Sequence, residues 1–185
     1  MSTRKLLSAA KALIAELQSS TAHPEQRELL NAVFDALLFI DSTGQIYAFE
    51  DYRRHLASDD LPLVVASFDT RQAAETWLQK HPEPPSSALI LIADQYHELA
   101  FIRELNLRRI SPHPVLDEFL RALIRDGLPP AVASFTTRQE AETWFKGQDT
   151  LGRQSLIRIA GRPYLAVYQP RIQHRAIYPF PAFPP

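Results

Sequence analysis

Histidine, serine and the acidic residues are the side chains of this sequence that could do acid–base or nucleophilic chemistry. The six histidines lie mostly in predicted loops or beside prolines. Only His97 and Glu98 place a base beside a carboxylate, and adjacent residues of a strand point to opposite faces of a sheet. The sequence has no His-Glu-x-x-His motif, no glycine-rich phosphate loop and no paired metal-ligand spacing. We therefore predict a protein that is not an enzyme and that uses no cofactor or metal.

The most distinctive polar residues form a Thr-Arg-Gln triplet that occurs twice, at 70–72 and 137–139. Because a guanidinium group can hold a carboxylate through two hydrogen bonds, Arg71 and Arg138 are candidate contacts for acidic groups on a partner. The alternative is a structural role, in which threonine caps a helix and arginine pairs with the glutamate four residues later. Arg108 and Arg109, between the two copies, are further candidate binding residues.

The triplet belongs to a longer stretch that the chain carries twice, at an offset of 67 residues. Residues 61–80 and 128–147 are identical at 13 of 20 aligned positions. In each copy a short apolar run predicts a buried strand, and an Ala/Trp spacing then predicts a helix with one apolar face. Two further apolar runs around a tight polar or glycine turn predict a β-hairpin. Two copies indicate a duplication, since stacked arrays usually need about three or more repeats.

The predicted fold class is α+β, with a helical hairpin at 1–44 followed by αβαββ repeats at 45–113 and 114–170. Each repeat is expected to form a small, three-stranded antiparallel sheet. A β-hairpin over 37–49 remains an alternative to the end of the helical hairpin. Residues 171–185 alternate proline with aromatics, which predicts an extended, polyproline-like tail. Its Tyr178 and Phe180 either lie on their own domain or dock on a partner.

Composition restricts the function further. The chain has no cysteine, which excludes disulfides, thiolate zinc sites and a cysteine nucleophile, and its net charge of −1 argues against nucleic-acid binding. No stretch reaches about 18 apolar residues, so no membrane span is expected. Lys11 and Glu16 interrupt the apolar part of the N-terminus, which argues against an export signal. Cytoplasmic localisation is the resulting prediction.

The string VASFxTRxxAExW, followed after a loop by LIxIA, resembles a myxobacterial family of small paralogous proteins. Members carry one or more copies of this βαββ unit, and some are regarded as immunity or self-recognition proteins encoded beside toxins. The resemblance covers residues 61–102 and 128–171 and implies no catalytic residues. The unit is also similar, more weakly, to the SPOR repeat, which binds peptidoglycan glycan, with Ala66-Ser67-Phe68 in place of Gly-Ser-Phe.

These observations predict a bacterial, non-enzymatic protein-binding protein, most concretely an immunity-type inhibitor that neutralises a cognate toxin. A small-ligand regulatory module and a SPOR-like glycan-binding protein are the alternatives. The partner's identity and the oligomeric state are not fixed by the sequence. Positions that differ between the copies, such as Asp94 against Gly161, are where a duplicated scaffold could acquire one asymmetric site.

Overall fold

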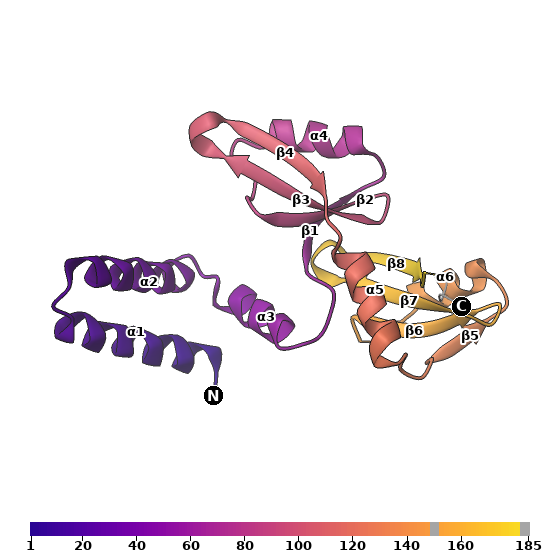
Figure 1. Cartoon of the computed structure of the whole chain (residues 1–185), viewed down its shortest axis with the longest axis horizontal. Coiled ribbons are helices and arrows are strands. Elements are labelled where there is room, and N and C mark those ends of the chain that lie inside the picture. The colour runs from indigo at the N-terminus through magenta and orange to yellow at the C-terminus, as the bar shows by residue number, and fades with distance from the viewer. Residues whose placement is uncertain (149–151, 182–185) are drawn as a thin grey trace. The chain divides into compact units, whose positions relative to one another are not determined.

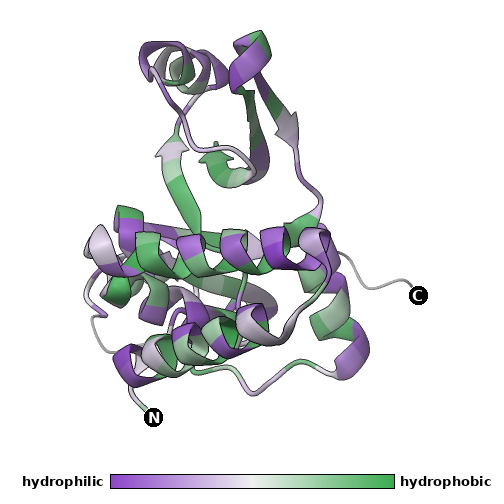
Figure 2. Ribbon diagram, turned by 90° about the vertical axis from the view of Figure 1, so that its left-hand side faces the viewer, coloured by the Kyte–Doolittle hydropathy of each residue, from purple (hydrophilic) through white to green (hydrophobic). Residues whose placement is uncertain are grey.

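A computed structural model describes residues 1–148 and 152–181 and shows helices at the N-terminus followed by two small four-stranded sheets (Figure 1). The predicted α+β class is confirmed. The chain divides into two compact units, Met1–Asp59 and Asp60–Pro185. The helices carry hydrophobic and hydrophilic residues side by side (Figure 2), as helices that bury one face do.

The first unit contains three helices: α1 (Thr3–Ser20), α2 (Pro24–Ser42) and α3 (Ile46–Leu56). Helix α1 begins where the Ser2 side chain accepts a hydrogen bond from the backbone N–H of Lys5, and Pro24 occupies the first turn of α2. Gly44, at φ +73°, separates α2 from α3. The helical prediction for this segment is confirmed, and the alternative β-hairpin over 37–49 is wrong. Helix α3, assigned to the first repeat by sequence, is grouped with the helical hairpin.

The second unit contains both repeats. The first repeat comprises β1 (Val64–Phe68), α4 (Arg71–Lys80), β2 (Ala88–Ile92), β3 (Gln95–Ile102), the 3-10 turn η1 (Arg103–Leu105) and β4 (Leu107–Pro112). The second repeat comprises α5 (Val115–Asp126), β5 (Ala133–Phe135), α6 (Arg138–Lys146), β6 (Gln154–Ile159), β7 (Arg162–Gln169), the 3-10 turn η2 (Pro170–Ile172) and β8 (His174–Pro179). The expected strand, helix and hairpin of each copy are therefore present.

The sheets differ from the prediction in strand number and direction. Their strand orders are β1-β2-β3-β4 and β5-β6-β7-β8, so each sheet has four strands rather than three. The first pair of each sheet is parallel and the other pairs are antiparallel. A helix that crosses over the sheet between two neighbouring strands returns the chain in the same direction, which makes the sheets mixed rather than antiparallel.

The C-terminal segment is not the predicted extended tail at His174–Pro179, because these residues form β8 and pair with β7 in antiparallel register. Residues 182–185 of that tail lie outside the described residues. The offset of 67 continues through this segment, where Arg108 and Ile110 of β4 match Arg175 and Ile177 of β8. The proline-rich composition concealed a strand because β8 lies at the sheet edge, where prolines are tolerated.

Three clusters of buried side chains hold the second unit together. Helix α4 covers one face of the first sheet and α6 covers one face of the second, each through a buried alanine and a larger apolar residue one turn later. The remaining faces share a single core to which α5 also contributes. It includes Leu91 and Tyr96 of the first sheet, Leu165 and Tyr178 of the second, and Leu120 of α5. The two repeats are therefore one packed body rather than two independent domains.

The tight turns between β2 and β3 and between β6 and β7 require left-handed backbone. Ala93 and Asp94 have φ of +46° and +63°, and Ala160 and Gly161 have φ of +48° and +76°. Two-residue hairpins of this kind favour glycine at the second position. The second repeat has that glycine, whereas the first has an aspartate.

Replacing Gly161 with alanine tests this turn. The added Cβ meets no atom within 4 Å, so only the left-handed backbone opposes it, and we expect the free energy of unfolding to fall by about 1 kcal/mol. Urea unfolding followed by tryptophan fluorescence reports on the second unit, because both tryptophans lie there. Gly147→Ala is the control: Gly147 has φ −85°, so its stability should stay the same or rise slightly. Equal losses in both variants would show that the turn conformation is not the cause.

Candidate functional site

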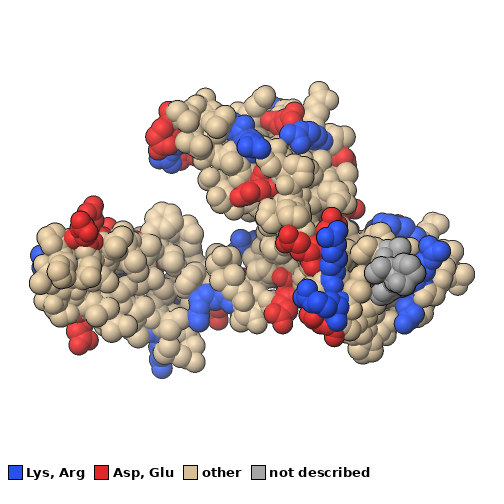
Figure 3. All heavy atoms as spheres, in the orientation of Figure 1, with Lys and Arg blue, Asp and Glu red and all other residues tan. Residues whose placement is uncertain are grey.

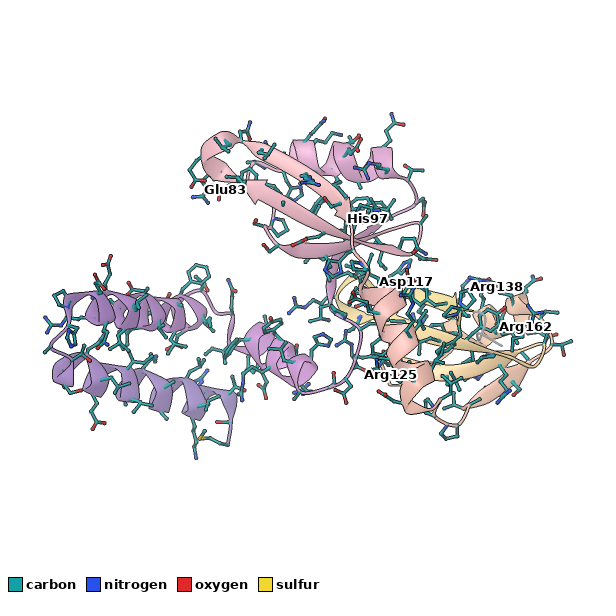
Figure 4. All side chains as sticks on the ribbon, in the orientation of Figure 1. Glu83, His97, Asp117, Arg125, Arg138 and Arg162 are labelled. Atoms are coloured by element: carbon teal, nitrogen blue, oxygen red, sulfur yellow. The ribbon has the colours of Figure 1, made fainter. Side chains whose placement is uncertain are left out.

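Arg71 and Arg138 occupy equivalent positions at the starts of α4 and α6, and each is bound to its own repeat. The Nε of each donates to a glutamate four residues later at 2.8 Å. Their Nη2 atoms donate to the backbone oxygens of Ile110 in β4 and Ile177 in β8, at 3.1 and 3.3 Å. Arg138 is labelled beside β8 in Figure 4. The structural interpretation of the triplet therefore accounts for both arginines, since each ties its helix to the last strand of its sheet.

Arg108 and Arg109 differ in their surroundings. The Arg108 guanidinium lies 5.0 Å from the centroid of the Phe101 ring and donates through Nη2 to the backbone oxygen of His81 at 3.2 Å. Its counterpart in the second repeat, Arg175, stacks on Tyr168 at 4.3 Å. Arg109 points to solvent and stays a candidate contact residue.

Tyr178 and Phe180, predicted as possible docking residues, belong to the shared core. Tyr178 is 4% exposed within β8, and Phe180 packs against the same cluster. A partner could not reach the Tyr178 ring without opening the sheet. Of the two alternatives for these aromatics, packing on their own domain is the one observed.

Two hollows of similar composition lie beside α4 and α6. The first, of about 600 Å³, is lined by Phe68, Thr70, Gln72, Ala73, Thr76, Trp77 and Lys80. The second, of about 560 Å³, is lined by Phe135, Thr137, Gln139, Glu140, Thr143 and Trp144. The aromatic wall is the same in both, with Phe–Trp ring centroids 5.5 and 5.1 Å apart.

Five pairs of lining residues are identical at the offset of 67, and the fold explains only some of them. Thr70 and Thr137 cap their helices, each accepting a backbone hydrogen bond at 3.2 Å. Gln72 and Gln139 are exposed, and among the residues that the structure describes neither side chain makes a hydrogen bond. Their amides are free to donate and accept at the mouth of each hollow.

The junction between the sheets carries polar residues that sequence reasoning did not bring together. His174 Nε2 lies 2.7 Å from Asp94 Oδ1. Gln169, 2% exposed, donates through Nε2 to the Tyr96 hydroxyl at 2.9 Å and to the backbone oxygen of Pro62 at 3.2 Å. The difference between Asp94 and Gly161 was the only sequence signal for this asymmetric site, since its partners lie 73 to 107 residues apart.

Burial governs the ionisation of the two tyrosines at this junction. Loss of solvent raises the pKa of Tyr96 to about 12, partly opposed by its hydrogen bond with Gln169. Burial also raises the pKa of Tyr178, and the nearby Tyr96 and Asp94 add to that rise. Both hydroxyls are therefore neutral at physiological pH, and the Tyr96 hydroxyl accepts a hydrogen bond from Gln169 rather than acting as a base.

Other features of the described residues bear on chemistry. In that part of the chain no group of three His, Asp or Glu side chains is arranged to hold a metal ion. His97, predicted as an unpromising base, has its Nδ1 3.0 Å from the backbone oxygen of Gln95. Blue and red residues are interspersed over the face seen in Figure 3. No single described helix is long and apolar enough to cross a membrane; only α2 and α3 together would be, and they are bent by 116°.

Comparison of the chain with protein-family models, curated proteins and solved structures finds no match. The resemblance drawn from the repeat stays a prediction.

Removing the Arg138 side chain tests its structural role. We expect Arg138→Ala to lower the free energy of unfolding by about 1 kcal/mol, because β8 loses a hydrogen bond from α6. Arg162→Ala, an exposed arginine at the start of β7 (Figure 4), should change it by less than about 0.5 kcal/mol. Urea unfolding of both variants makes the comparison. An Arg138→Ala protein as stable as the wild type would contradict the structural role and would make Arg138 a candidate binding residue again.

Alkaline unfolding tests the burial of Tyr96. An unfolded tyrosine ionises near pH 10, whereas Tyr96 in the folded chain ionises at about 12. Between these values the folded state keeps a proton that the unfolded state releases, so stability present below pH 10 is lost as the pH rises to 12. Tyr96→Phe should cost about 1 kcal/mol at neutral pH and make stability fall less steeply in that window. Tyr47→Phe, in the other compact unit, should keep the wild-type slope. If stability fell as steeply between pH 10 and 12 in Tyr96→Phe as in the wild type, the raised pKa of Tyr96 would be contradicted.

Proposed function

We propose that this chain is a non-enzymatic protein-binding protein, and most concretely an immunity-type inhibitor that binds and neutralises a cognate toxin. The observation that carries the proposal is the pair of equivalent hollows, whose exposed glutamines are identical in both repeats without a structural reason. The resemblance of the repeat to immunity-type proteins supports the toxin as the partner.

The composition of the hollows indicates what they would bind. The shared lining is a phenylalanine, a tryptophan, two threonines and a glutamine, with no shared charge, since Lys80 lines only the first hollow and Glu140 only the second. An aromatic wall suits an apolar or prolyl side chain, and a glutamine amide can pair with both groups of a peptide bond. A peptide segment of a protein therefore fits both hollows.

Two hollows on one packed body allow bivalent binding. Once one hollow is occupied, the second binds as if the partner were locally concentrated, which raises affinity without new contacts. The small-ligand alternative has less support, because such sites enclose most of their ligand and each hollow is walled only by one helix and the end of one strand.

Affinity capture with a tagged full-length chain tests the proposal. The wild type should retain one stoichiometric protein, and Gln72→Arg with Gln139→Arg should lose it, because a long charged side chain then fills the mouth of each hollow. Gln95→Arg is the matched control: Gln95 is exposed, and the second repeat already has Arg162 at the equivalent position. The control should retain the partner.

Co-expression tests the toxin-neutralising form. The captured partner should arrest growth when expressed alone, and the wild type should restore growth where the double arginine variant does not. A partner retained by the double variant would exclude the hollows as the binding site. Recovery of the folded chain alone would contradict the protein-binding function and favour a small ligand, to be sought by thermal shift with a metabolite panel.

A further inference from the structure

The helical hairpin formed by α1 and α2 buries little of its apolar surface. Leu7 and Ile14 are the buried apolar residues of α1, and α2 has no buried residue. Two polar contacts cross the hairpin: Lys11 Nζ lies 2.6 Å from Asp41 Oδ2, and Gln18 donates to Asn31 at 2.8 Å. The hydrogen bond from Lys11 lowers the pKa of the Asp41 carboxyl.

One side of this hairpin carries an exposed apolar stripe, which we define as Leu13, Leu17, Leu29 and Val33. Their side chains are 56%, 43%, 68% and 50% exposed. Leu17 and Leu29 line the same hollow between the helices, of about 320 Å³. Leu13 lies one turn before Leu17 in α1 and Val33 lies one turn after Leu29 in α2, on the same face, so the stripe is continuous. Most of the N-terminal unit is uncharged on the face seen in Figure 3.

The charges on the two helices indicate what covers the stripe. Helix α1 has three basic residues and one acidic residue, and α2 has four acidic residues and one basic residue. A second copy related by a two-fold axis parallel to the helices would place each α1 against the α2 of its partner. Every neighbouring pair would then be antiparallel and of opposite charge, as in a four-helix bundle.

We propose that two copies of this chain associate through the apolar stripe, and that their hairpins form an antiparallel four-helix bundle. Helices of 18 and 19 residues are about 28 Å long, so covering one face of the hairpin in both copies buries on the order of 1,000 Å² or more, which reaches the minimum of about 1,000 Å² expected of a biological interface. This proposal is independent of the hollows and of the function assigned to them.

Sedimentation equilibrium of the full-length chain tests the association. The wild type should sediment with the mass of two 21.0 kDa chains, and Leu29→Lys should dissociate at least tenfold more readily. Leu29 is already largely exposed, so the hairpin should keep its helical circular dichroism. Leu105→Lys changes an equally exposed leucine in the second unit and should remain a dimer. A monomeric wild type at tens of micromolar would overturn the proposal, as would a dimer unaffected by Leu29→Lys.

Crosslinking tests the arrangement of the bundle. The sequence has no native cysteine, so only the introduced cysteines can react. Placing α1 over the partner's α2 brings Leu17 of one copy beside Leu29 of the other. A mixture of Leu17→Cys and Leu29→Cys chains, treated with a short bis-maleimide, should therefore give far more covalent dimer than either variant alone. Dimers formed equally well by Leu17→Cys alone would overturn the antiparallel pairing of α1 with α2.

Discussion

The second unit depends on one constraint: each sheet has two apolar faces, but the crossover helix between its two parallel strands, α4 or α6, covers only one of them. The run Leu89–Ile92 shows this in four residues, since Ile90 and Ile92 face α4 while Leu89 and Leu91 face the other way. An uncovered apolar face of a sheet costs free energy in proportion to its area. Sharing one core, to which α5 also contributes, removes both faces from water at once, which explains why the duplication gave a single body rather than two domains.

This shared core forces the two copies to differ. A residue on the face covered by a repeat's own helix has the same surroundings in both copies, whereas a residue at the junction faces a different sheet in each. Leu91 is buried in the common core, and its counterpart Arg158 is exposed and donates to the backbone oxygen of Gly161 at 3.2 Å. Gln169 is buried against Tyr96, while the residue equivalent to Gln169 in the first repeat, Ile102, is 43% exposed. Such buried polar groups are tolerated because they are hydrogen-bonded.

The sequence was informative where local rules decide the structure and uninformative where long-range packing does. The start of α6 was predictable because Thr137 and Glu140, three residues apart, fit a capping box, and that box is present. Strand β8 differs from the predicted tail because proline and aromatic composition favours an extended segment, and only the repeat offset indicates a strand there. The sheets were predicted to be antiparallel, although a helix between two neighbouring strands makes that pair parallel. The contacts of Arg71 with Ile110 and of Asp94 with His174 join distant residues, which no local pattern reveals.

Some residues are identical in both repeats because the fold requires them, whereas the identity of others needs another cause. Ala74 of α4 and Ala141 of α6 are fully buried between their helices and the sheets. Any larger side chain would displace the sheet, so packing alone preserves them. Arg71 and Arg138 are preserved by their bonds to the last strand. Gln72 and Gln139 are exposed, and their side chains make no hydrogen bond within the described residues. The exposed positions next to them, Ala73 and Glu140, have diverged. An exposed side chain that stays the same while its neighbours change is better explained by what it binds than by what it supports.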